Sequence, residues 1–356
     1  MANRHQSETL PPPTQDLGLP SYKLPTKGIL SLLPTPWVPY AELIRLEKPA
    51  GTTYLFLPCV FGTLLAASLA TPIVSPAVLL STNALFLVGS ALFRGAACTW
   101  NDTLDRALDR KVARTRLRPL ARGAISPTAA HVWTGTQVLL GLGMLQYFPP
   151  QCLLYSLPSV AIIAFYPLAK RLTNYPQLVL GFAWSWGIVM GFPAMGIDLL
   201  GNSTALMAAA CLYSSNIAWT VLYDTIYAHQ DIKDDVKAGI KSTAVAYGGS
   251  TKWLLTGLGA AQVSFLAAAG LAIGAGPAFY AGTCGLTTIA LATMIRRVNL
   301  KKPGDCWWWF NWGAWLTGGS IASGFLAEYI LRLRVERVGK TRAGDRLLIE
   351  ERASKM

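Results

Sequence analysis

The stretch "NALFLVGSALFRGAACTW", residues 83–100, runs directly into "NDTLDRALD", residues 101–109. The first part is apolar enough for lipid, whereas the second carries three carboxylates, which are costly near a bilayer. The pattern recurs in "SSNIAWTVLYDTIYAHQDIKDD", residues 214–235, where an apolar segment again ends in acidic side chains. Two apolar helices that both end in acidic clusters indicate a membrane protein with a polar site at these helix ends.

The composition supports this class, because only 14% of the 356 residues are charged, against about 25% in soluble domains. The mean hydropathy is +0.37. A spanning helix needs about 20 apolar residues, so each of the four longest tracts poor in charge holds a helical hairpin and the last holds one helix. The tracts that contain at most one charged residue are 49–93, 123–169, 172–223, 253–295 and 306–331.

The sequence therefore predicts an all-α, polytopic membrane protein with a bundle of nine transmembrane helices. We place the helices at residues 43–68, 76–100, 128–147, 152–169, 177–196, 204–223, 252–274, 277–296 and 307–331. The links after the second, fourth, sixth and eighth helices carry Lys and Arg, and the positive-inside rule places them in the cytoplasm. Around this domain, residues 41–331, we predict a disordered Pro-rich arm, 1–40, and a charged tail, 332–356.

The net charge of +13 fits this topology together with an anionic ligand. The basic residues lie between apolar spans and no nucleic-acid-binding motif is visible, so we expect no nucleic-acid partner. The six cysteines are scattered and lack metal-binding spacing, which is typical of packing residues. We also find no sign of an obligatory protein partner.

The two acidic clusters predict a metal–diphosphate site. On ideal helices, Asn101, Asp105 and Asp109 share one face, and the second cluster forms a narrow stripe. A solvated charged loop explains one such cluster equally well, but two clusters on the same membrane side favour a binding site. Oxygen ligands suit Mg²⁺, which typically takes one or two carboxylates plus substrate phosphates. Nearby basic residues suit the phosphates.

The acidic motifs carry a resemblance to a known family. "NDTLDRALD" resembles the NDxxDxxxD motif of UbiA-type intramembrane prenyltransferases, and "DIKDD" at residues 231–235 resembles their DxxxD motif. Roughly residues 40–330 match, including "LIRLEKPAGTTYLFLP" and "RPLARGAIS". The sequence is most similar to the branch that prenylates 4-hydroxybenzoate-like aromatic acids. The resemblance implies a nine-helix bundle with a central cavity.

The resemblance also implies the reaction, which is transfer of a prenyl group from a polyprenyl diphosphate to the ring of a phenolic aromatic acid. Mg²⁺ would then neutralise the leaving diphosphate, and aromatic faces such as Tyr54, Tyr166, Trp219 or Tyr223 could stabilise the allylic cation. We assign the metal to Asp102, Asp105, Asp109, Asp231 and Asp235, with Asn101 and Asp224 in support. We assign the diphosphate to Arg114, Arg118, Lys170 and Asn101.

Arg94 lies two helical turns before Asn101, about 10.5 Å deeper in the membrane. A buried arginine needs an anionic partner. One interpretation is an ion pair with a carboxylate of a neighbouring helix. We favour a second one, in which Arg94 binds the carboxylate of the aromatic acid. Arg45 is an alternative or additional contact for the same group.

The sequence leaves the pathway open. We favour transfer of a farnesyl-type chain in terpenoid or meroterpenoid secondary metabolism, in an endomembrane of ER or Golgi type, because residues 1–40 lack a transit-peptide pattern. The alternative is the 4-hydroxybenzoate polyprenyltransferase of ubiquinone synthesis in the mitochondrial inner membrane. A transporter or cation channel is the alternative from another class, because it too places carboxylates at membrane depth.

Overall fold

The computed structural model describes residues 21–354, with side chains from 21 to 341 apart from Lys170. Every regular element in this range is a helix, as predicted. The elements are η1 (Ile29–Leu32), η2 (Thr35–Trp37), α1 (Val38–Leu43), α2 (Ala50–Leu69), α3 (Pro76–Leu104), α4 (Arg106–Asp109), α5 (Pro127–Leu145), α6 (Gln151–Leu172), α7 (Pro176–Trp184), α8 (Gly187–Ala194), α9 (Ser203–Ala228), α10 (Ile232–Ala238), α11 (Thr243–Tyr247), η3 (Gly248–Ser250), α12 (Thr251–Ala272), α13 (Pro277–Phe279), η4 (Tyr280–Leu286), α14 (Thr287–Arg297) and α15 (Pro303–Ser354).

Seven helical segments of the described chain are long and apolar enough to cross a membrane, so the polytopic membrane class is confirmed. The number nine is not confirmed. Helices also occupy the other two predicted spans, 128–147 and 307–331, as α5 and the first half of α15. These two helices are less apolar, because α5 contains His131 and Gln137 and α15 begins with a run of tryptophans. The seven segments are Ala50–Leu69, Pro76–Leu104, Gln151–Ala169, Pro176–Ala194, Ser203–Ala228, Thr243–Ala272 and Pro277–Arg297.

Capping residues in the sequence determine where several helices begin. Ser75 accepts a hydrogen bond from the Val78 amide at the start of α3, and Ser126 accepts one from Ala129 at the start of α5. A proline occupies the first position of both helices, where its fixed φ and missing N–H have no cost. These local signals explain why the observed boundaries lie close to those read from the sequence.

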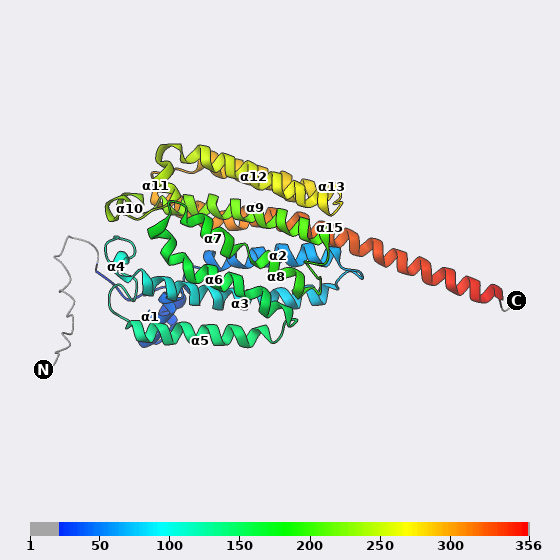
Figure 1. Cartoon of the computed structure of the whole chain (residues 1–356), viewed down its shortest axis with the longest axis horizontal. Coiled ribbons are helices and arrows are strands. Elements are labelled where there is room, and N and C mark those ends of the chain that lie inside the picture. The colour runs from blue at the N-terminus through cyan, green and yellow to red at the C-terminus, as the bar shows by residue number, and fades with distance from the viewer. Residues whose placement is uncertain (1–20, 355–356) are drawn as a thin grey trace.

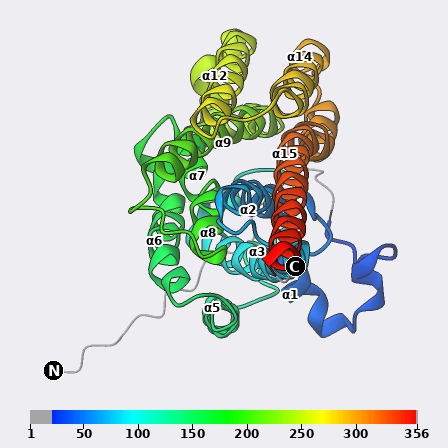
Figure 2. The ribbon, with the colours of Figure 1, turned by 90° about the vertical axis from the view of Figure 1, so that its right-hand side faces the viewer.

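Helix α2 lies inside the bundle, between α3, α8 and α15 (Figure 2). It approaches α8 at backbone distance, where Gly62 and Gly191 face each other. A Cβ atom on Gly191 would overlap the backbone of Gly62 and Thr63. Both glycines lie in apolar tracts, and the sequence does not indicate which way they face. Their actual place is the α2–α8 contact, which only glycine permits.

Residues 21–40 differ from the disordered arm predicted over 1–40. Residues 21–37, which we call the strap, contain η1 and η2, and Leu30 is buried. At the end of the strap, the rings of Trp37 and Tyr40 contact Trp133 of α5. Packing of aromatic side chains, which a Pro-rich composition does not reveal, orders this segment. The rest of the predicted arm, 1–20, lies outside the described residues.

The predicted boundary before the tail, at residue 332, falls inside α15, which continues without a break to Ser354 (Figure 1). A charged cluster at this boundary binds the helix to the turn between α12 and α13. Arg332 Nε donates to Glu328 Oε1 at 2.6 Å, and Arg332 Nη2 donates to the Ile273 carbonyl at 2.6 Å. Glu328 Oε2 accepts from the Gly276 amide at 3.0 Å. The charges at 328 and 332 therefore join the tail to the bundle.

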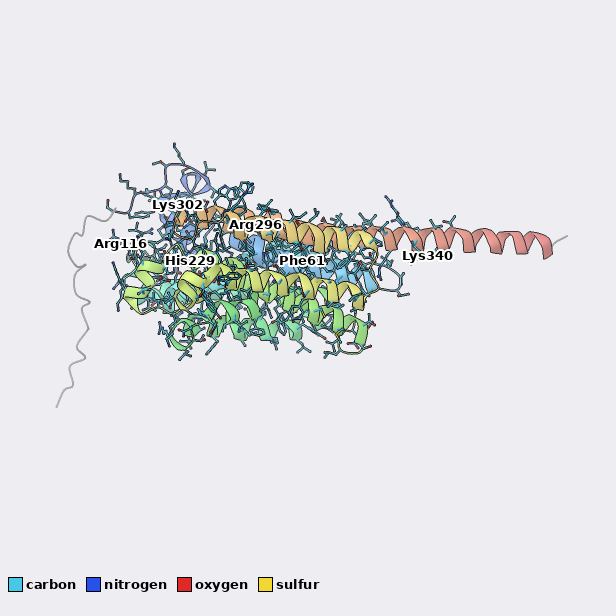
Figure 3. All side chains as sticks on the ribbon, turned by 90° about the horizontal axis from the view of Figure 1, so that it is seen from above. Phe61, Arg116, His229, Arg296, Lys302 and Lys340 are labelled. Carbon is cyan, nitrogen blue, oxygen red and sulfur yellow. The ribbon has the colours of Figure 1, made fainter. Side chains whose placement is uncertain are left out.

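The links predicted to share one membrane side lie at one end of the bundle. Figure 3 shows Arg116, His229 and Lys302 toward this end and Lys340 beyond the other. α4 and α10, which follow the two acidic clusters, also lie there (Figure 1). The arrangement brings both clusters to the same end, as their shared membrane side requires.

Replacing Arg332 by alanine should destabilise the fold, because Glu328 is only 6% exposed and would lose its cationic partner. Breaking a buried pair on one side typically costs about 3 kcal/mol. We expect a lower thermal midpoint for purified Arg332→Ala in detergent. Arg334→Ala is the matched control, since Arg334 is exposed and two residues away. Equal midpoints for the two variants would contradict the role of this cluster.

Candidate functional site

A cavity of about 500 Å³ lies where the two acidic clusters meet. It is lined by side chains from α3 and α4, from the 110–126 link, and from α9 and α10. Every predicted site residue whose side chain is described lies on its wall. These are Arg45, Arg94, Asn101, Asp102, Asp105, Asp109, Arg114, Arg118, Asp224, Asp231 and Asp235. The side chain of Lys170 lies outside the described residues.

The first cluster does not lie on one straight helix, as the wheel for residues 101–109 assumed. Helix α3 ends at Leu104, and Asp105 has φ −88° and ψ 3° at the junction with the short α4. Asp102, Asp105 and Asp109 are nevertheless all buried. The break turns the chain toward the 110–126 link.

The second cluster is broken in the same way. Helix α9 ends at Ala228, and Asp231 is the N-terminal flanking residue of α10, which ends at the left-handed Gly239. The narrow stripe predicted for Asp224, Asp231 and Asp235 therefore does not exist as one helix face. Aspartate favours helix ends over helix interiors, so both clusters sit at breaks where a uniform helix wheel fails.

Arginines neutralise the buried carboxylates. Arg45 Nη2 lies 2.6 and 2.8 Å from the two oxygens of Asp102, which is 1% exposed. Arg118 Nη1 donates to Asp102 at 3.0 Å and to Asp109 at 2.9 Å. Charge-assisted bonds of this length are strong. The cluster is thus balanced by groups that also suit phosphate oxygens.

Arg114 and Arg118 remain charged in this setting. Arg114 binds Asp231 through both its Nε and its Nη2, the shortest distance being 2.6 Å. Burial opposes the charge on Arg118, but the neighbouring Asp102 and Asp109 outweigh it and raise the pKa of the guanidinium. Burial likewise opposes the charge on Arg114, and Tyr227 and Asp231 raise its pKa. Both groups are permanent cations on the cavity wall.

The acidic residues do not form a complete metal cage. Among the residues with described side chains, no group of three or more His, Cys, Asp or Glu is arranged to hold an ion. Asp102 and Asp109 do come together, because both contact the same Arg118 nitrogen within 3.0 Å. A pair of carboxylates fits Mg²⁺ when substrate phosphates complete its coordination. The seven-residue metal set stays a prediction, and the donor chemistry of the cavity suits it.

Arg94 contacts backbone carbonyls rather than a carboxylate of a neighbouring helix. Its Nη1 lies 3.2 Å from the carbonyl oxygens of Ile44 and Arg45, in the turn between α1 and α2. Gly51 leaves room for the guanidinium, since a Cβ there would overlap Arg94 Nε. The ion-pair interpretation is therefore wrong, and the assignment to an acceptor carboxylate stays a prediction. Arg45, the second candidate, binds Asp102.

The cavity also contains residues that the sequence reasoning missed. Burial lowers the pKa of Lys48, which lies on the wall beside α2. Most of the missed charged residues lie in the segment "AELIRLEKPAG", 41–51, from which the sequence analysis chose only Arg45 as a site residue. Of the four aromatic residues suggested for cation stabilisation, Tyr166 lines the cavity and the other three pack in the core. The missed residues are Tyr22, Glu42, Glu47, Lys48, Arg122, Gln177 and Tyr227.

Comparison with known proteins agrees with this geometry. A sequence model described as the UbiA prenyltransferase family matches residues 55–318. The chain is 45% identical over 306 residues to "4-hydroxybenzoate polyprenyltransferase, mitochondrial" of Saccharomyces cerevisiae, covering 85% of this chain and 80% of that one. Its fold resembles the apo structure of a UbiA homolog from Aeropyrum pernix K1, with a TM-score of 0.63 and 26% identity over 77% of this chain and 97% of that one.

A UbiA homolog from Archaeoglobus fulgidus bound to GPP and Mg²⁺ shares the fold, with a TM-score of 0.59 and 20% identity, covering 83% of this chain and 99% of that one. These matches overturn one prediction. The yeast relative is named mitochondrial, which contradicts the endomembrane location we inferred from residues 1–40. The composition of the leader does not determine the organelle. The relatives are named 4-hydroxybenzoate polyprenyltransferases, which favours our alternative prediction, the enzyme of ubiquinone synthesis, over the prediction of an enzyme of secondary metabolism.

Removing Asp102 should destabilise the protein more than removing Asp231. Asp102→Ala leaves Arg45 and Arg118 without a shared, buried partner, at a cost of about 3 kcal/mol. Asp231→Ala frees Arg114, which is 34% exposed and can turn to water, at a cost of about 1 kcal/mol. Thermal unfolding of both variants in detergent without Mg²⁺ measures the difference. A larger loss for Asp231→Ala would show that Arg45 and Arg118 do not depend on Asp102.

Proposed function

Because the chain belongs to the UbiA prenyltransferase family, we propose that it transfers a polyprenyl group from a polyprenyl diphosphate to the ring of 4-hydroxybenzoate. It is a prenyltransferase, an enzyme that transfers alkyl groups other than methyl. The observation that carries the proposal is one cavity that holds both acidic clusters and their arginines. The 45% identity to a protein of that name supports the acceptor. This is the ubiquinone alternative, and we place it in a mitochondrial membrane.

The arginines and carboxylates of the cavity bind the donor's head group. Arg114 and Arg118 line the cavity, and guanidinium suits phosphate oxygens. Asp102 and Asp109, with Asp231 across the cavity, would hold Mg²⁺, which when bound supplies positive charge that makes the diphosphate a better leaving group. The arginines stabilise the negative charge that develops on the leaving group as the allylic C–O bond breaks.

The apolar part of the cavity receives the prenyl chain and excludes water. Its wall is formed by side chains from α2, α3, α6 and α7. Water must be kept from the allylic cation, and such a wall does that. The phenol ring then forms the new C–C bond and loses a proton, so no nucleophilic side chain is needed. The wall residues are Leu55, Phe93, Ile163, Leu180 and Trp184.

Arg94 orients the acceptor in this scheme. It lies on the cavity wall seven residues before Asn101, so the carboxylate of the acid binds deeper than the diphosphate. Only Nη1 of the guanidinium contacts the Ile44 and Arg45 carbonyls. Those contacts fix its orientation and leave its other nitrogens for a carboxylate. In this proposal the phenol ring lies between Arg94 and the ionising carbon of the donor.

We further propose that all nine predicted helices cross the membrane around a central cavity, with α5 and α15 completing the bundle. The basic links and the acidic helix ends then share one side. The transporter or channel alternative requires a polar path through the membrane, and family membership argues against it. The chain length of the donor is set by the apolar wall rather than by the charged residues.

The purified protein should form a prenylated acid from a polyprenyl diphosphate and 4-hydroxybenzoate only when Mg²⁺ is added. EDTA should abolish product, as should Asp231→Ala, which removes a ligand at low cost in stability. Mass spectrometry of products, with C10, C15 and long donors, measures the reaction and the chain preference. Product formed in EDTA, or none with any donor at saturating Mg²⁺, would contradict the proposed function.

Arg94→Ala should weaken acceptor binding much more than donor binding. Loss of one charge-assisted pair in a dry site raises the acceptor KM about 30- to 1,000-fold. Arg94→Lys should recover little, because bidentate geometry is lost. Gly51→Ala is a second probe, since its methyl group displaces the guanidinium while Arg94 is retained. Separate KM values for donor and acceptor decide the role. An equal rise in both would assign Arg94 to structure or to diphosphate binding.

A further inference from the structure

Tyr22, in the strap, contacts both members of an ion pair at the cavity. Its hydroxyl donates to Glu42 Oε1 at 2.8 Å, and the guanidinium carbon of Arg122 lies 3.7 Å from the centre of its ring. Arg122 Nη2 in turn donates to Glu42 Oε2 at 2.6 Å. Each of the three side chains therefore contacts the other two, and all three line the cavity.

The Glu42–Arg122 pair within this group is protected from water. The side chains of Glu42 and Arg122 are each only 13% exposed, so solvent and salt screen the pair weakly. Burial, and then the hydrogen bond to Glu42, raise the pKa of Tyr22, so the phenol keeps its proton and stays a donor.

Arg122 connects this group to the diphosphate-binding residues. Between residues 110 and 125 the chain forms turns and bends held by backbone hydrogen bonds, among them Arg122 N–H to the Arg118 carbonyl at 2.9 Å, and side-chain contacts add to these. Arg122 Nη1 donates to the Leu117 carbonyl at 2.6 Å, immediately before Arg118. Arg118 is the residue that contacts Asp102 and Asp109. A continuous series of contacts therefore runs from Tyr22 through Arg122 to Arg118.

The strap holds Tyr22 in place from its other end. Val38, directly after the strap, is 2% exposed, and Trp37 packs against Trp133. Most of the strap is open to solvent, with Leu32 82% exposed, although Leu30 is buried. Tyr22 is thus the point at which the strap reaches the cavity. It lies outside the part of the chain that matches the family, which begins at residue 55.

We propose that Tyr22 is a positioning residue for the donor: through Glu42 and Arg122 it holds the 110–126 link in the conformation in which Arg118 binds the diphosphate. This inference rests on the proposed function and adds a residue on which binding of the diphosphate donor depends. Tyr22 does not touch the reacting atoms. Tyr22 therefore affects the binding of the donor, whereas the binding of the acceptor and the rate of the chemical step depend on other residues.

Tyr22→Phe tests the proposal, because it removes only the hydroxyl and keeps the ring over Arg122. Loss of a hydrogen bond to a carboxylate should raise the KM for the polyprenyl diphosphate about tenfold. The kcat and the KM for 4-hydroxybenzoate should change less than about twofold. Tyr147→Phe is the matched control, since Tyr147 is 76% exposed in the turn between α5 and α6. An unchanged donor KM, or equal rises in both KM values, would overturn the proposal.

A double-mutant cycle identifies the route of the effect. Arg122→Lys keeps the charge opposite Glu42 but loses the planar group that stacks on Tyr22. If Tyr22 acts through Arg122, adding Tyr22→Phe to Arg122→Lys should raise the donor KM less than about twofold further. Effects that multiply fully would show that Tyr22 acts by another route and would contradict the proposal.

Binding of Mg²⁺ and inorganic pyrophosphate separates this proposal from the proposed function, because it needs no transfer reaction. We expect Tyr22→Phe to weaken pyrophosphate binding about tenfold in calorimetry, with an unchanged melting temperature. That result in a protein that transfers no prenyl group would support the positioning role while contradicting the reaction. Equal pyrophosphate affinity in Tyr22→Phe and wild type, or a lower melting temperature alone, would overturn the positioning role.

Discussion

Asp102 lies between two guanidinium groups at the end of an apolar helix, and the site is arranged around this contact. A carboxylate that is 1% exposed cannot remain ionised without such partners. Arg45 comes from the turn before α2, and Arg118 comes from the link after α4. Neutralising this one charge brings together the turn between α1 and α2, the end of α3 and the 110–126 link. The same cations then face a cavity that suits a diphosphate.

Much of the fold could be predicted from the distribution of charge. Tracts with at most one charged residue located the long helices, and Ser–Pro pairs occur where α3 and α5 begin. The count of membrane crossings could not be fixed, because α5 and α15 mix apolar with polar or aromatic residues. The ordered strap and the continuous α15 were also missed. Both depend on contacts between residues far apart in the chain, such as Tyr22 with Arg122 and Arg332 with Ile273.

The residues of the site were more predictable than their geometry. The acidic motifs named the aspartates that line the cavity, but helix wheels misplaced them because the chain breaks at Asp105 and Asp231. The partner of Arg94 is a pair of backbone carbonyls, which no sequence pattern shows. The organelle was predicted wrongly from the leader, whereas the relative that matches most of the chain is named mitochondrial. Local composition carries less information about location than relatedness does.

The contact between Gly62 and Gly191 has a consequence for how this enzyme can diversify. Where two backbones touch, no side chain can grow or shrink, so the α2–α8 side of the molecule offers evolution nothing to vary. Side chains on α3, α6 and α7 face the cavity with Phe93, Ile163 and Trp184, and each can be exchanged for a smaller or larger one. Variation in the shape of the cavity would therefore accumulate at these exchangeable side chains, while the Gly62–Gly191 contact stays fixed.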